Sequence, residues 1–207
     1  MARNELKNHA PQGVVFEALL ILVAAVGGWL FGHSPVTSLH VTGSQADDLG
    51  WRIGQGLVAA LPPLAGMLWI SRSPLPACRE LRGLVERLIG PLFAGTRWWE
   101  FLLLAVAAGV GEELLFRGLI QEGLASWCGE PWGMWIGITV ASVLFALGHA
   151  LNHTYLWLAF FMSWYLGWLL QATGSLLVPM VAHAAYDWVA LWYLLRCRPL
   201  TEKSRES

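Results

Sequence analysis

Two glutamates and an arginine lie close together inside an otherwise apolar stretch of the chain. They are Glu112, Glu113 and Arg117, in the run GVGEELLFRG. On a helix, Glu113 and Arg117 are spaced i, i+4 and share a face, so they can form an ion pair. Glu112 points about 100° away from that face. It is therefore either part of a charge cluster that holds helices together, or a free carboxylate that can act as a general base.

Two histidines and an aspartate occupy two later apolar stretches. His149 lies four residues after Phe145 in FALGH, and His183 lies four residues before Asp187 in HAAYD. A single histidine in an apolar helix is often only a hydrogen-bonding group between helices, and Asp187 could equally serve helix packing. Carboxylate and imidazole are, however, the groups that deprotonate water and hold it against a carbonyl carbon. Together with Glu112, these side chains predict a hydrolytic site.

The composition determines what kind of elements must position these groups. The 207 residues are 56% hydrophobic and only 13% charged, against about 25% charged in a typical soluble domain. The formal net charge of −1 excludes a nucleic-acid-binding protein, which needs a basic surface. A disordered chain and a typical soluble enzyme are excluded as well. The lipid bilayer is the solvent that such a composition requires.

Several apolar stretches are long enough to cross a bilayer. They cover residues 14–31, 54–70, 98–124, 132–151, 155–172 and 175–195. In lipid, backbone groups must be paired within a span, so these stretches are predicted to be helices. Eleven of the 13 lysines and arginines fall before the first span, between the second and third, or after the last, which predicts that both termini are cytoplasmic. We therefore predict an all-α, polytopic membrane helix bundle with about six transmembrane helices.

The chain changes character near residue 98. Residues 1–97 are predicted to hold two transmembrane helices and a basic amphipathic loop. Residues 98–195 form the predicted four-helix catalytic core, and residues 196–207 a basic cytoplasmic tail. Pro62 and Pro63 predict a kink in the second helix, because proline has no backbone N–H to donate.

The depths of the polar residues in the bilayer put a condition on this arrangement. Residues 80–93 are amphipathic and are expected to lie along the interface. Glu17 lies near the start of the first span and is expected to reach that interface. On straight spans, Glu112 and His149 fall at different depths. They meet only if the fourth helix extends past Leu151 or the third begins outside the membrane.

The three motifs, in this order, resemble the CPBP family of intramembrane proteases. That family includes the type II CAAX prenyl endopeptidases and bacteriocin-processing or self-immunity proteins. Its pattern is Glu-Glu-x-x-x-Arg, Phe-x-x-x-His and His-x-x-x-Asn/Asp, and the chain contains all three. The stretch ATGSLLVP at residues 172–179 is also similar to the family's sequence. The resemblance covers residues 98–195.

The resemblance implies a role for each motif residue. Glu112 would be the general base that activates water, and His149 would help to hold that water. His183 and Asp187 would stabilise the oxyanion. The supporting residues would be Glu113 and Arg117, as a structural pair, and Phe145.

Asp187 departs from the residue found in many relatives, which is Asn. An Asn amide donates a hydrogen bond, whereas an ionised Asp only accepts one. Asp187 must therefore be protonated, orient His183, or act as a metal ligand, and we favour orientation of His183. No metal or other cofactor is expected, although Glu and His could bind Zn²⁺; the sequence has no H-E-x-x-H motif.

The predicted protein is an intramembrane endopeptidase of the glutamate type. Its expected partners are the lipid bilayer and a membrane-associated protein or peptide substrate, and its expected location is the bacterial inner membrane. One alternative is an ion- or proton-coupled transporter, although the sequence shows no inverted repeat. Another is a catalytically silent scaffold or immunity protein, which would not need to keep Glu112 and both histidines.

Overall fold

The protein is built from helices. The computed structural model describes residues 8–39 and 45–197, and these ranges contain no β-strand. The all-α prediction is therefore confirmed, whereas residues 198–207 of the predicted tail lie outside the described residues. The main helices are α1 (Ala10–Phe31), α2 (Gln45–Ala59), α3 (Leu61–Arg72), α4 (Pro76–Leu84), α5 (Trp98–Glu113), α6 (Glu122–Cys128), α7 (Gly133–Gly148), α8 (His153–Thr173) and α9 (Leu177–Trp192).

Judged by length and composition alone, two helical segments of the described chain could cross a bilayer. They are Ala10–Phe31 and Asp48–Arg72, and the apolar helix α7 is shorter. The second segment is interrupted where α2 ends at Ala59 and α3 begins at Leu61. Pro62 and Pro63 lie in the first turn of α3, so the break falls where the prolines predicted it.

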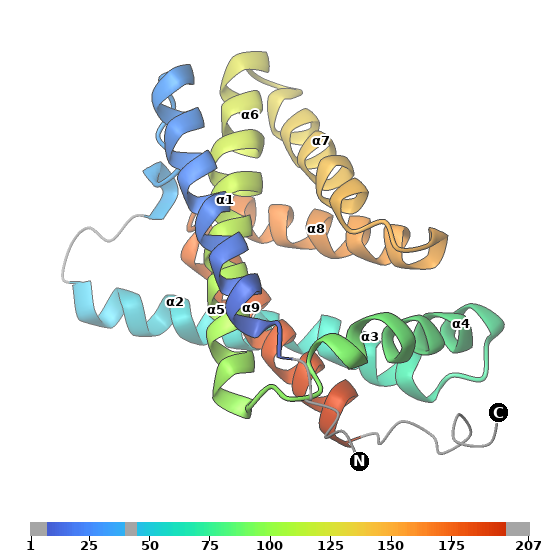
Figure 1. Ribbon diagram of the computed structural model, residues 1–207. Coiled ribbons are helices and arrows are strands. Elements are labelled where there is room, and N and C mark those ends of the chain that lie inside the picture. The colour runs from blue at the N-terminus through green and yellow to red at the C-terminus, as the bar shows by residue number, and fades with distance from the viewer. Residues whose placement is uncertain (1–7, 40–44, 198–207) are drawn as a thin grey trace, which may run out of the picture.

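A long helical column forms the centre of the molecule. The helices α5 and α6 are joined without a break by a π-helix, η4 (Leu114–Gln121). Figure 1 shows this column in green and yellow, with α1 running beside it. At 1.5 Å per residue the column is about 46 Å long, which exceeds the roughly 30 Å of a bilayer's hydrocarbon core. On its other sides, α9 packs against α5, and α7 packs against α6 and η4.

The hairpin between α6 and α7 explains how His149 reaches the level of Glu112. From Glu112 to the end of α6 the chain rises about 24 Å, and from Gly133 to His149 it returns about 24 Å. The fourth span therefore does not extend past Leu151, since α7 ends at Gly148. Instead, the column is longer than one straight span. Gly133 and Gly137 let α7 lie directly against the backbone carbonyls of Ala125 and Gln121.

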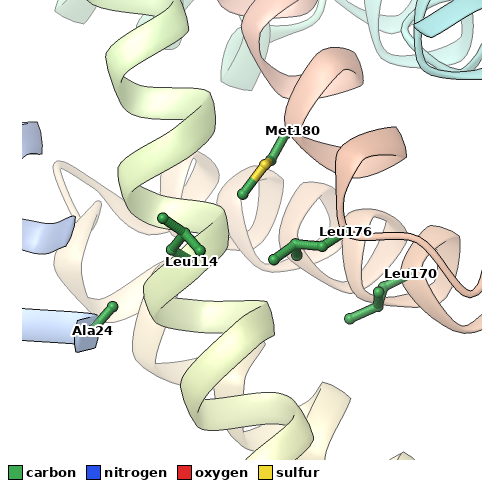
Figure 2. Packing of buried hydrophobic residues seen from close by; sticks show 5 residues of the cluster. All are labelled: Ala24, Leu114, Leu170, Leu176 and Met180. Carbon is green, nitrogen blue, oxygen red and sulfur yellow. The ribbon is translucent and has the colours of Figure 1, made fainter. Parts of the chain in front are cut away.

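Apolar packing joins the column to its neighbours. Ala24 of α1, Leu114 of η4 and Met180 of α9 meet in one buried cluster with Leu170 and Leu176 (Figure 2). Large apolar side chains also cover the outside of the molecule, for example on α1 and on α7. An outer surface of this kind suits contact with lipid, because extensive exposed apolar area is unfavourable in water.

Candidate active site

The three motif segments meet at one point in the structure. Glu112 comes from α5, His149 follows the last residue of α7, and His183 comes from α9. The Nε2 atoms of His149 and His183 lie 3.7 Å from Glu112 Oε1 and Oε2, respectively. Glu112 is only 7% exposed. Helices that are distant in sequence thus bring one buried carboxylate between two imidazoles.

The predicted ion pair of Glu113 and Arg117 is present. Arg117 Nη1 donates to Glu113 Oε1 at 2.9 Å, and both side chains are fully buried. Arg117 Nη2 also donates to the backbone oxygen and the hydroxyl of Ser163, at 2.8 and 3.0 Å. The guanidinium carbon lies 5.2 Å from the ring centroid of Phe145. The buried charge is therefore compensated on several sides, as a charge in an apolar interior must be.

The π-helix η4 holds this pair against α8. Arg117 and Gln121 are four residues apart, and Gln121 Nε2 donates to the Gly167 carbonyl at 3.1 Å. Their partners Ser163 and Gly167 are also four residues apart, so the two helices are joined at successive turns. The small residues Ala159, Ser163 and Gly167 already show this spacing in the sequence. Our sequence reasoning overlooked Ser163, which that pattern could have revealed. π-helical turns occur often at functional sites.

His183 is bound more tightly than the sequence predicted. Its Nδ1 lies 2.8 Å from Glu113 Oε1, the same oxygen that accepts from Arg117. Its Nε2 lies 3.5 Å from Asp187 Oδ2. Both ring nitrogens thus face carboxylate oxygens, which is the arrangement of a doubly donating imidazolium. The bond between Glu113 and His183 was not predicted, because it joins residues 70 positions apart.

His149 is oriented by the residue that precedes it by one turn. Its Nδ1 lies 2.9 Å from the Phe145 carbonyl oxygen. A carbonyl only accepts, so Nδ1 carries the hydrogen and Nε2 presents a lone pair to Glu112. The His149 ring stacks on the Phe145 ring, with centroids 4.3 Å apart. Phe145 therefore supports both His149 and the Arg117 guanidinium.

A cavity of about 410 Å³ opens onto this cluster. Glu112, His149, His183 and Asp187 all line it. Most of the remaining lining is apolar and comes from α3, α4, α8 and α9, and it includes side chains that sequence reasoning did not select. These are, among others, Met67, Arg82, Tyr155, Met162 and Tyr186. Met67, Tyr155, Met162 and Tyr186 are ordinary residues for membrane helices, and Arg82 falls in a segment that already contains several arginines, so no local signal in the sequence marks them.

Two further features of the described residues concern metal binding and Glu17. Within the part of the chain that the structure describes, no group of three His, Cys, Asp or Glu side chains is arranged to hold a metal ion. We expected the Glu17 side chain to extend to the membrane interface, but it is only 7% exposed and lies within the protein, against α5. That expectation was wrong because Glu17 lies on the face of α1 that packs against the column.

The fold and the site together define an all-helical protein with a buried carboxylate–histidine cluster and a largely apolar exterior. The family model for type II CAAX prenyl endopeptidase Rce1-like proteins matches residues 94–189. An uncharacterized protein of Bacillus subtilis (strain 168), YpbD, is 39% identical in an alignment of 178 residues, and the match covers 83% of this chain and 82% of the relative. No solved structure matches the chain. The chain belongs to the Rce1-like family of membrane proteases.

Proposed function

We propose that this protein is an intramembrane endopeptidase of the glutamate type, in which Glu112 activates the attacking water. The observation that carries the proposal is that the buried Glu112 lines the cavity, with a histidine 3.7 Å from each of its carboxylate oxygens. These separations exceed a hydrogen bond, and a water molecule can bridge them.

Two acceptors can orient a water molecule for attack. Glu112 Oε1 and the Nε2 lone pair of His149 would each accept one hydrogen of the water, so that an oxygen lone pair is left to attack the carbonyl carbon. Glu112 would take the proton and later deliver it to the leaving amine. Because the bond of His149 to the Phe145 carbonyl fixes its tautomer, this second acceptor needs no rearrangement.

His183 is the proposed stabiliser of the oxyanion. Its Nε2 is 3.5 Å or more from both Asp187 and Glu112, so its N–H would be available to donate a hydrogen bond to an oxyanion in the cavity. Glu113 holds the opposite nitrogen and keeps the ring charged and in place. In this scheme Asp187 orients His183 and supports its charge, which is the role that an aspartate can fill without donating a hydrogen bond.

The proposed substrate is a membrane-associated protein or peptide, because the cavity walls are largely apolar and are formed by helices that also carry exposed apolar side chains.

We also propose the predicted topology, with six spans, both termini in the cytoplasm of a bacterium, and a catalytic core over residues 98–195. The proposed chemistry requires no metal, since Glu112 and His149 suffice to orient the water.

Cleavage of quenched fluorogenic peptides by the purified protein in lipid bilayers tests the proposal. A prenylated CAAX-type peptide and its unprenylated counterpart separate the two substrate classes. We expect Glu112→Gln to abolish cleavage, Glu100→Gln to retain it as a matched control, and a chelator to leave it unchanged. Undiminished cleavage by Glu112→Gln would refute the role of Glu112. Loss of cleavage on chelation, with recovery on adding Zn²⁺, would instead indicate a metalloprotease.

A further inference from the structure

The cavity beside the cluster contains a cation that the proposed mechanism does not use. Arg82 belongs to α4 and is half-buried, and among the described residues that line the cavity it is the only arginine or lysine. A guanidinium is not deprotonated in proteins, so the charge is permanent. Because most of the surrounding wall is apolar, this charge is screened less than it would be in bulk water. A fixed positive charge in such a cavity therefore calls for an explanation.

Part of the Arg82 side chain has a structural role. Its Nη1 donates to the carbonyl oxygens of Ile70 and Ser73, at 2.7 and 2.9 Å, where α3 ends. These bonds tie α4 to α3 and satisfy carbonyl groups that the end of a helix leaves open. Arg82 makes no other hydrogen bond in the described part of the chain, so Nε and Nη2 are available to donate to a bound group.

The charge of Arg82 is not balanced by a carboxylate of the described chain. The acidic residues of the same segment are Glu80 and Glu86, and Glu80 accepts a hydrogen bond from Asn152. Glu86 follows Arg82 by four residues, in the π-helix η2 (Val85–Ile89), and lines the same cavity, but the two side chains do not form an ion pair. The carbonyl groups that Arg82 contacts are neutral dipoles, so a bound anion would supply the missing counter-charge.

A carboxylate is the anion that suits both Arg82 and its surroundings. A guanidinium binds a carboxylate through two parallel N–H···O bonds, and such charge-assisted bonds are stronger than neutral ones. The apolar wall suits the uncharged remainder of a peptide. Glu112 and Asp187 line the cavity from α5 and α9, and they would repel a further carboxylate, which would therefore lie toward α4. Arg82 would thereby fix the direction in which a peptide lies in the site.

We propose that Arg82 is a specificity-determining residue, which binds a carboxylate of the peptide substrate in the cavity. The carboxylate is either the free C-terminal group of the peptide or an acidic side chain. Helix α4 lies in the amphipathic segment between the predicted spans, so a carboxylate bound there avoids the cost of a charge within the hydrocarbon. The inference rests on the proposed function, because it takes the cavity to be the substrate site. Binding, however, is measurable without cleavage.

Binding of the prenylated CAAX-type peptide to the protein in bilayers of zwitterionic lipid tests the proposal. Three fluorescent forms are compared in the Glu112→Gln variant, which is expected to leave the peptide intact. The first form has a free C-terminal carboxylate and no acidic side chain, the second has a C-terminal amide instead, and the third is the amide with an internal aspartate. We expect a carboxylate form to bind at least about tenfold more tightly than the uncharged amide. The form that is favoured identifies the source of the carboxylate.

Substitutions of the arginine then assign the preference to it. Arg82→Gln should abolish the preference, and Arg82→Lys should retain part of it, because lysine keeps the charge but cannot form two parallel bonds. Arg79→Gln is the matched control, since it removes the same charge from the same helix, whereas Arg79 is exposed and does not line the cavity. Because Arg82→Gln also removes the bonds to α3, affinities are compared as a ratio within each variant, which a smaller folded fraction does not change.

Equal binding of the three forms by Glu112→Gln, or a preference that persists after Arg82→Gln, would overturn the proposal. Loss of the preference in Arg79→Gln would overturn it too, because the charge of the whole helix would then be responsible. The proposed function is tested separately. If Glu112→Gln cleaves the peptide as fast as wild type, while the ratio of kcat/KM for the charged and uncharged forms still depends on Arg82, the proposed function fails and the role of Arg82 stands.

Discussion

Glu112 and Glu113 are adjacent, but substitution by glutamine should lower the stability of the protein only at Glu113. Glu113 Oε1 accepts from Arg117 at 2.9 Å and faces His183 Nδ1 at 2.8 Å, and the pair with Arg117 is fully buried. Removing one partner of a buried ion pair costs about 3–5 kcal/mol. In a chain of this size, that loss lowers the melting temperature by about 6–20 °C. Glu112 Oε2, by contrast, has no hydrogen-bond partner in the described structure, so Glu112→Gln should not destabilise the protein.

Equilibrium unfolding in mixed detergent micelles, followed by the fluorescence of the 13 tryptophans, measures this difference. A double-mutant cycle of Glu113→Gln and Arg117→Met isolates the pair. The double variant should lose less stability than the sum of the single variants, by about 0.5–3 kcal/mol. The reasoning is refuted if Glu113→Gln unfolds within about 1 kcal/mol of Glu112→Gln, or if the two single losses add.

Three further changes test the surroundings of the site. Asp187→Asn should lower kcat about tenfold, corresponding to about 1.4 kcal/mol of lost support for the charged His183; full activity would exclude a requirement for negative charge at 187. Ser163→Ala removes one hydrogen bond to Arg117 and should cost about 1.5–3 kcal/mol of unfolding free energy, whereas an unchanged stability would show that the backbone oxygen alone suffices. Gly137→Val brings a side chain against the Gln121 carbonyl, so it should cost at least about 1–3 kcal/mol and reduce cleavage by displacing α7. Normal stability and activity of that variant would contradict the close packing of the hairpin.

Local spacing predicted part of the site well. The pairing of Glu113 with Arg117 depends only on the i, i+4 geometry of one helix, and the structure contains it. The convergence of Glu112, His149 and His183 is a property of three helices, and the sequence indicated it through their residue types and the resemblance to a family, not through local spacing.

Packing between helices decided what the sequence could not predict. His149 reaches Glu112 because the hairpin is tight and the column is long, and neither length follows from hydropathy. The contact of His183 with Glu113 and the burial of Glu17 both depend on which helix faces are in contact. A membrane helix carries apolar side chains on all of its faces, so the period of its hydrophobic residues does not show which face is buried in the protein.

The cavity takes its reactive groups and much of its wall from different halves of the chain. Glu112, His149, His183 and Asp187 come from the second half, whereas Met67, Leu81 and Arg82 come from the first. Arg82 is fixed by hydrogen bonds to the carbonyls of Ile70 and Ser73, so this wall is a defined structure of its own. Substitutions between residues 62 and 86 can therefore alter which peptides enter the cavity without changing Glu112, His149, His183 or Asp187. Selectivity and chemistry can diverge separately in such a protein, and exchanging this segment between relatives would transfer one without the other.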